Sequence, residues 1–351
     1  MRPGLPGVGQ EYIGMVLKQV AEAGIHLLVG FRGTTFQEQL KSLIDEFGIG
    51  GIVLFRRNIQ TPEQLRSLLE EMQSHARQVL GRSLWVAIDQ EGGPVQRLVP
   101  PFTQLPSACD LAQQGIEAVA EWSSKAAMDL RRMGIHINLA PVLDLRVNAN
   151  SHFMEGRCLG DDPLTVAELG CRWIKTLQGA GVSATAKHFP GLGLAELDPH
   201  HFAPVIRWPD QEAMQRDLLP FRKAIEAGVH CVMTSHALYP FIDSVWPATL
   251  SPAINNDLLR GTLGFRGTLL SDDMDMAAVS EKYSWKEMAE QGLLATIDFF
   301  LLCQRTENIE QLQGALCAAI AGSSRIEAMH RESAKRIEWL YDRHRMEHQG
   351  G

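Results

Sequence analysis

Eight short apolar runs alternate along the chain with longer segments of helical periodicity. The runs cover residues 26–31, 50–55, 84–89, 137–144, 182–189, 231–238, 267–274 and 297–303. Each is almost wholly apolar rather than alternating, which is typical of parallel strands buried on both faces. Eight such strands separated by helices predict an α/β fold of one domain over residues 1–351, a (β/α)8 TIM barrel. A final helical pair is expected from residue 310 to about 348.

A doubly wound open sheet is the alternative architecture. Such a sheet usually carries a glycine-rich phosphate loop after an early strand. The glycines of residues 7–14 are not preceded by a strand, so they do not fit that loop. No linker rich in Gly, Ser or Pro divides the chain, which favours the single barrel.

The segments between the strands carry helix start signals. Thr61, Pro62 and Gln64 combine an N-cap, a proline at the first helical position and a capping-box side chain. Capping-box spacing recurs in three pairs: Thr35 with Glu38, Ser284 with Glu287, and Ser324 with Glu327. Helices are therefore expected to begin at each of these places.

Composition narrows the class of protein. The 351 residues are 45% hydrophobic and 21% charged, with a net charge of −8, and no long Lys/Arg cluster occurs. These values are typical of a globular protein and argue against nucleic acid or a membrane as a partner. The N-terminus lacks an apolar segment of signal-peptide type, and no run approaches a membrane span, so a cytoplasmic location is expected. Six scattered cysteines without a CxxC pair predict buried thiols rather than a metal site.

Polar residues gather where the predicted strands end. In a barrel of this type the active site lies at the carboxyl ends of the strands. Buried charges are costly unless they are paired or used, so several convergent ones point to a ligand, and a sugar needs many hydrogen-bond partners. The strand-end residues are Asp89, Gln90, Glu91, Asp144, Lys187, His188, Ser235, His236, Asp272 and Asp273.

Asp272 lies just after the apolar residues 267–270, separated from them by Ser271, and should point into the mouth of the barrel. A carboxylate there could attack an anomeric carbon and form a glycosyl-enzyme. Helix N-capping is the alternative role, and it suits Asp273 or Asp275 equally well.

Other candidate residues have more than one possible role. Asp89 could bind sugar hydroxyls, or it could form a structural pair with Arg97. Lys187 and His188 could donate hydrogen bonds to a sugar ring, and a Schiff-base lysine is the rival role for Lys187. Arg157 could clamp a substrate oxygen, brace a carboxylate or lie on the surface.

Asp198 and His200 lie two residues apart in a segment with several Pro and Gly residues. An Asp beside a His fixes its tautomer and favours the protonated ring, which makes a usable proton donor near neutral pH. A solvated loop pair is the alternative. Residues 189–204 are expected to form a mobile catalytic loop, and no carboxylate has ligand spacing to His200 and His201, so no metal is expected.

At these residues the chain resembles the β-N-acetylglucosaminidases of glycoside hydrolase family 3, close to the bacterial cytoplasmic enzymes of cell-wall recycling. The motifs that carry the resemblance occur in family order: DQEGG (89–93), FTQLPSA (102–108), NLAPVLDL (138–145), GRCLGDDP (156–163), KHFPGLG (187–193), DPHHFAP (198–204) and SDDMDM (271–276). The combination of KHFPG with a downstream Asp-x-His is the most specific part.

The resemblance implies a role for each matching residue. Asp272 matches the nucleophile, His200 the general acid/base, and Asp198 the partner that orients it. Asp89, Arg157, Lys187 and His188 match sugar-binding positions, and Arg97, the candidate partner of Asp89, is expected among the substrate-binding residues as well. The implied activity is a retaining, exo-acting β-N-acetylhexosaminidase without a cofactor, acting on small GlcNAc-containing glycans or muropeptides as a monomer or weak homo-oligomer.

Three residues depart from the family pattern. Leu192 stands where His is frequent, Pro199 where Ser separates the Asp and His, and Cys158 where Ser is common. Proline restricts the residue before it to extended conformations, so Pro199 could stiffen the loop.

Other activities stay open at this stage. A histidine acid is neutral after it donates its proton, so phosphate could replace water and give a β-N-acetylglucosaminide phosphorylase. A broader β-glycosidase, a Schiff-base aldolase using Lys187, and a non-catalytic sugar-binding barrel are the remaining alternatives.

Overall fold

The computed structural model describes residues 22–147, 152–195 and 204–349 and forms a closed parallel barrel. Neighbouring strands pair in the order β1-β2-β3-β6-β7-β8-β11-β12, and β12 closes on β1 with Leu27 opposite Phe300. The predicted (β/α)8 barrel is confirmed, with a strand in each apolar run. The strands are β1 (Leu27–Val29), β2 (Gly51–Leu54), β3 (Trp85–Ile88), β6 (Ile137–Asn138), β7 (Ser183–Phe189), β8 (Cys231–Thr234), β11 (Thr268–Asp273) and β12 (Phe299–Leu302).

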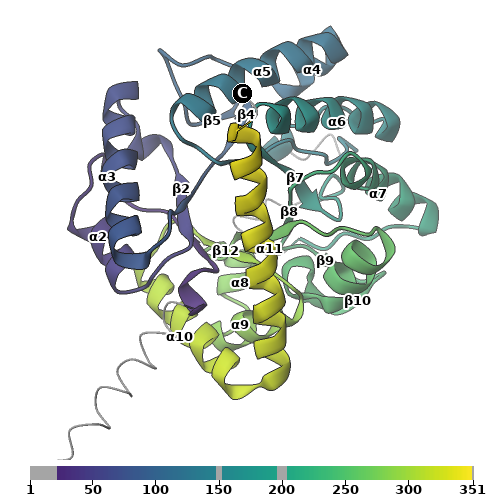
Figure 1. Ribbon diagram of the computed structural model, residues 1–351. Coiled ribbons are helices and arrows are strands. Elements are labelled where there is room, and N and C mark those ends of the chain that lie inside the picture. Colours follow the sequence, from purple (N-terminus) through teal and green to yellow (C-terminus); the bar gives the residue numbers. More distant parts are fainter. Residues whose placement is uncertain (1–21, 148–151, 196–203, 350–351) are drawn as a thin grey trace, which may run out of the picture.

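Helices surround the barrel (Figure 1). The α-helices are α2 (Glu38–Asp45), α3 (Pro62–Leu80), α4 (Ala108–Gln114), α5 (Ile116–Arg132), α6 (Pro163–Gly179), α7 (Gln211–Glu226), α8 (Ala277–Ser280), α9 (Trp285–Leu294), α10 (Thr306–Gly322) and α11 (Ser324–Gln349), and a π-helix covers Ala253–Thr262. None of the described helices is both long enough and apolar enough to cross a membrane.

Two short hairpins extend the carboxyl ends of the barrel. β4 (Gln90–Gly92) pairs with β5 (Val95–Gln96) after β3, and β9 (Leu238–Tyr239) pairs with β10 (Asp243–Pro247) after β8. The sequence did not predict them, because their strands are only two to five residues long and lack a clear apolar pattern.

Burial on both faces explains why the strands are apolar throughout. In β1, Leu27 and Val29 belong to the core between the sheet and the helices, whereas Leu28 belongs to the core inside the barrel. Ile337 and Leu340 of α11 join that inner core. Strand side chains alternate between the faces, so both sets must be apolar when both faces are covered.

The helix start signals are partly confirmed. Thr61 caps α3 by accepting from the Gln64 amide (3.1 Å), and Ser284 with Glu287 forms a full capping box at α9. The Thr35–Glu38 box is wrong, because α2 begins at Glu38 after Gln37, which makes no side-chain cap bond. At α11 the capping hydroxyl belongs to Ser323, one residue before the expected Ser324, and accepts from the Ile326 amide (3.4 Å).

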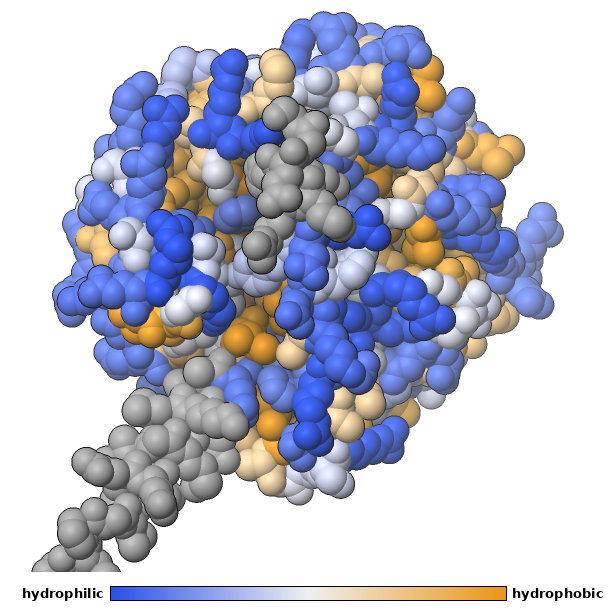
Figure 2. All heavy atoms as spheres, in the orientation of Figure 1, coloured by the Kyte–Doolittle hydropathy of each residue, from blue (hydrophilic) through white to orange (hydrophobic). Residues whose placement is uncertain are grey.

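Helix α11 lies across the amino-terminal end of the barrel (Figure 1). Tyr341 donates to the carbonyl of Ser83, just before β3, and Thr268 at the start of β11 donates to the carbonyl of Arg336. Figure 2 shows this end of the molecule as mainly hydrophilic, with hydrophobic areas scattered between the helices. The opposite, carboxyl end of the barrel is therefore the open one.

Candidate active site

A cavity of about 420 Å³ lies at the carboxyl end of the barrel. It is lined by six residues that the sequence predicted for the site, together with Glu91 and the two aspartates after Asp272: the six are Asp89, Arg97, Arg157, Lys187, His188 and Asp272. Asp198, Pro199 and His200, the predicted acid/base pair and the proline between them, lie outside the described residues, as does half of the predicted loop, residues 196–203. The structure thus brings together the substrate-binding positions and the nucleophile position, while their roles stay predictions.

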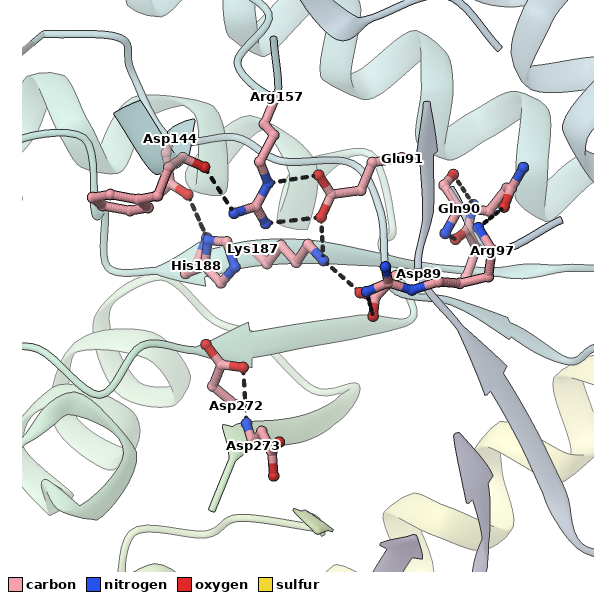
Figure 3. Close-up of polar contacts among 12 residues, drawn as sticks. Asp89, Gln90, Glu91, Arg97, Asp144, Arg157, Lys187, His188, Asp272 and Asp273 are labelled. Carbon is pink, nitrogen blue, oxygen red and sulfur yellow. Dashed lines mark hydrogen bonds and ion pairs between the residues drawn. The ribbon is translucent and has the colours of Figure 1, made fainter. Parts of the chain in front are cut away.

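Lys187 is the centre of a buried ion-pair network (Figure 3). Its side chain extends from β7 into the cavity. The Nζ atom lies 3.0 Å from Asp89 Oδ1 and 2.6 Å from Glu91 Oε1. Its side chain is only 3% exposed. Burial alone would lower the pKa of Lys187, but the two carboxylates raise it above its usual value. A lysine held as a cation in this way is unsuited to Schiff-base formation, which needs the neutral amine.

Glu91 is a site residue to which the sequence reading assigned no role. Arg157 reaches it from the segment before α6 with two parallel hydrogen bonds, Nε to Oε2 (2.8 Å) and Nη2 to Oε1 (2.9 Å). Burial opposes ionisation of Glu91, but Lys187 and Arg157 lower its pKa well below the usual range. Arg157 therefore braces a carboxylate. The available signal was the spacing of Asp89 and Glu91, since residues two apart in an extended chain point to the same side.

Asp89 has two cationic neighbours and keeps part of its carboxylate accessible. Arg97, on the second strand of the β4–β5 hairpin, donates from Nη2 to Asp89 Oδ2 (3.2 Å), so the structural pair foreseen from the sequence is present. Burial would raise the pKa of Asp89, but Lys187 and Arg97 hold it below its usual value. The Asp89 side chain is 17% exposed, against 3% for Glu91. Asp89 is thus the acceptor that a ligand can reach.

His188 is oriented by Asp144, which lies beyond β6. Its Nδ1 lies 2.7 Å from Asp144 Oδ2, and its backbone amide donates to the same oxygen (3.1 Å). The strand predicted over residues 137–144 is shorter in the structure, where β6 ends at Asn138. Asp144 therefore lies in the segment that follows the strand. Asp144 is fully buried.

Asp272 lies near the end of β11 and faces the cavity. Burial would raise its pKa, but His188 first and then His236 oppose this and hold the pKa below its usual value. The Asp273 amide donates to Asp272 Oδ1 (2.8 Å). A partly buried carboxylate kept in its anionic form is suited to nucleophilic attack.

The alternative N-cap role does not fit the aspartates near Asp272. Helix α8 begins at Ala277 after Met276, which makes no side-chain cap bond. Asp273 accepts instead from the Cys303 amide (3.1 Å) after β12, and Asp275 accepts from the Gln304 amide (2.7 Å). Burial, with the charges of Asp275 and Asp272, raises the pKa of Asp273 to about 7. These two residues therefore join the ends of β11 and β12.

Within the described parts of the chain, no group of three or more His, Cys, Asp or Glu side chains is arranged to hold a metal ion. The cavity instead combines carboxylates with Lys and Arg donors, which are the groups that make charge-assisted hydrogen bonds to a neutral polar ligand.

Residues 15–338 match the model of the glycosyl hydrolase family 3 N terminal domain. The chain belongs to glycosyl hydrolase family 3. The resemblance drawn from the sequence motifs is therefore confirmed, and with it the assignment to a family of enzymes.

Relatives of known name extend the family match. The chain is 31% identical to a Beta-hexosaminidase of Nitrosomonas eutropha over 92% of each chain. It is 33% identical to Beta-hexosaminidase A of Pseudoalteromonas piscicida over 77% of its own length, but spans only 48% of that protein. The solved family 3 β-N-acetylglucosaminidase of Paenibacillus superposes with a TM-score of 0.88 at 35% identity, covering 92% of this chain and 62% of that one. This family 3 chain therefore spans nearly all of some relatives and about half to two thirds of others.

Proposed function

We propose that the chain is a β-N-acetylhexosaminidase that removes terminal β-linked N-acetylglucosamine with retention of configuration. The observation that carries the proposal is the cavity in which Asp272 faces the Asp89–Lys187–Glu91 network. Relatives named Beta-hexosaminidase, which align over most of this chain, support the activity. Asp89, Arg97, Arg157, Lys187 and His188 would bind the hydroxyl groups of the sugar.

The proposed reaction has two inverting steps. Asp272 attacks the anomeric carbon while the bond to the leaving oxygen breaks, and His200, oriented by Asp198, gives that oxygen a proton. Water then loses a proton to His200 and attacks the same carbon, which releases the sugar and restores the Asp272 carboxylate. No cofactor enters this scheme.

The first test replaces the nucleophile. Asp272→Ala should lower kcat/KM for an aryl β-N-acetylglucosaminide by roughly three orders of magnitude or more, because the covalent intermediate can no longer form. Asp257→Ala, which changes an exposed aspartate of the π-helix, is the matched control and should leave the rate unchanged. Comparable rates for Asp272→Ala and wild type would exclude this nucleophile.

The second test concerns the proton donor. For His200→Ala, the loss of rate should be far smaller for an acidic nitrophenol leaving group than for an alkyl one, since an acidic group needs no protonation. His201→Ala, at the neighbouring histidine, should show no such dependence. An equal loss with both leaving groups would remove the donor role from His200.

The wider setting is part of the proposal. The chain would act as one domain, with residues 189–204 as a mobile loop, on small GlcNAc-containing glycans such as muropeptides in the cytoplasm. Assays with muropeptides and chitobiose, with and without phosphate, would identify the natural aglycone. Formation of the sugar 1-phosphate would show a phosphorylase instead of a hydrolase.

A further inference from the structure

The carboxylate of Asp144 is fully engaged with a single short stretch of chain. Oδ2 accepts from the backbone amide of His188 (3.1 Å) and from its ring Nδ1 (2.7 Å), and Oδ1 accepts from the Leu192 amide (2.7 Å). Asp144 is 0% exposed and is not among the residues that line the cavity. It therefore cannot touch a substrate directly, and any effect on the reaction must pass through its partners.

The contact with Asp144 decides which ring nitrogen of His188 carries a proton. A carboxylate accepts and does not donate, so Nδ1 must be the N–H that points at Asp144. The other nitrogen, Nε2, is left for the cavity. Figure 3 shows the ring between Asp144 on one side and Asp272 on the other.

The ring faces the position at which the covalent bond is proposed to form. Of the charges around Asp272, that of His188 does most to keep the carboxyl ionised against the effect of burial. Among the described residues, His236 after β8, Lys187 on β7, the adjacent Asp273 and Cys303 after β12 also interact electrostatically with Asp272.

The same carboxylate fixes the backbone beyond β7. Gly193 packs so closely on the carbonyl of Leu145 that an added Cβ would lie 1.8 Å from that oxygen. The hydrogen bond from the Leu192 amide to Asp144 and the close packing of Gly193 on Leu145 together hold residues 192 and 193 against residues 144 and 145. Among the described residues, Asp144 also interacts electrostatically with Arg157 and Asp217.

We propose that Asp144 is a positioning residue for the glycosidase reaction: it holds the His188 ring with Nδ1 protonated so that the ring supports the anionic form of Asp272. The proposal rests on the proposed function, because it takes Asp272 to be the nucleophile. Asp144 itself forms and breaks no bond with the sugar.

Asp144→Asn tests the proposal, because asparagine keeps the size but removes the charge and one of the two acceptor oxygens. Asparagine offers a single carbonyl oxygen to the three N–H groups that now donate to Asp144, so the His188 ring loses its fixed anionic partner. The acid limb of the kcat/KM profile, measured with a nitrophenyl substrate that needs no general acid, should move up by about 1 pH unit. Asp144→Glu, which keeps the charge, should retain most of the wild-type limb.

A double-mutant comparison shows whether the effect passes through His188. In the His188→Ala background, Asp144→Asn should shift the acid limb no further. An equal shift with and without His188, or no shift in the single variant, would overturn the proposal.

An NMR measurement on the unchanged protein covers the case in which the variants fail to fold. The ¹⁵N chemical shifts of His188 should report a proton on Nδ1 across the pH range of activity, and an unprotonated Nδ1 would overturn the proposal. Failure of the nucleophile assignment is recognised separately, because Asp272→Ala would then stay active whatever the behaviour of Asp144.

Discussion

The two ends of the barrel both contain a buried cluster of charged residues, but one cluster lies beside a cavity and the other is covered by a helix. At the carboxyl end, Lys187 and Arg157 meet Glu91 beside a cavity of about 420 Å³. At the amino end, Asp298 is 0% exposed and is bound by Arg260 (3.1 Å) and Arg336 (2.8 Å). Helix α11 covers that second cluster, whereas the first is left accessible to a ligand.

Helix α11 also meets the barrel through uncharged polar contacts. His26 Nε2 lies 2.8 Å from His330 Nδ1, and the Ser183 hydroxyl lies 3.0 Å from His230 Nδ1 and 2.9 Å from His344 Nε2. Burial, with the nearby histidine in each case, lowers the pKa of His26 and of His230 to about 4. These two rings are neutral at pH 7, so their contacts add no further buried charge to the amino end.

The comparison separates stability from activity. A charged group whose partners are all supplied by the fold can serve only the fold, as Asp298 does. A charged group with an accessible side, such as Asp89, has hydrogen-bonding capacity left for a substrate. Substitutions at the two ends should therefore change different measured quantities.

Acid should act most strongly on the amino end. Because the pKa of His26 and His230 falls from 6.5 to about 4 on folding, the unfolded chain binds more protons between these values. The contribution of the two rings to the free energy of unfolding is complete above pH 6.5. It falls as the pH is lowered, by about 3 kcal/mol for each ring between pH 7 and pH 4. Urea unfolding at several pH values measures it, and His26→Gln should remove the part due to one ring. A pH dependence unchanged in that variant would contradict the expectation.

Loss of the Asp298 charge should come next. Asp298→Asn leaves Arg260 and Arg336 without a buried counter-charge and should lower the free energy of unfolding by about 3–5 kcal/mol. The kcat/KM of the folded variant should stay near wild type, because Asp298 lies at the end of the barrel away from the cavity. Glu332→Gln removes an exposed pair with Lys335 on the same helix and should change the free energy of unfolding far less than Asp298→Asn does. Equal effects of the two substitutions would remove the distinction between buried and exposed pairs at this end.

The smallest of these effects belongs to the carboxyl end. Asp89→Asn should leave stability close to wild type, since Lys187 keeps its 2.6 Å contact with Glu91. It should reduce kcat/KM by roughly 10- to 100-fold, the equivalent of one charge-assisted hydrogen bond to the sugar. Steady-state kinetics with denaturant unfolding on the same sample measures both. A large loss of stability with normal kinetics would place Asp89 with Asp298 as a structural residue.

The fold could be predicted because its signals are local. Each of the eight apolar runs contains a barrel strand, and Thr61 and Ser284 cap the helices that follow them as their sequences suggested. The Thr35–Glu38 spacing failed because a capping motif does not ensure that the chain before it takes the required conformation. The two short hairpins were not predicted, because a change of strand direction does not alter the pattern of hydrophobic residues.

The residues of the site could be predicted only as far as strand ends reveal them. Asp89, Lys187, His188 and Asp272 follow directly from their positions after apolar runs, and the cavity brings them together. Glu91 and Asp144 were visible at strand ends as well, but their partners were not. Glu91 and Arg157 are 66 positions apart, and no local rule relates them.

The sequence by itself determined the barrel, the edge at which its chemistry lies and the family to which the chain belongs. Periodicity and motif spacing are properties of neighbouring residues, so they can be read before the chain folds. Only the tertiary structure decided that Glu91 holds both Lys187 and Arg157, that Asp144 sets the tautomer of His188, and that α11 closes the opposite end through neutral histidines. These contacts join distant segments, and their protonation depends on burial, which exists only once the barrel is closed.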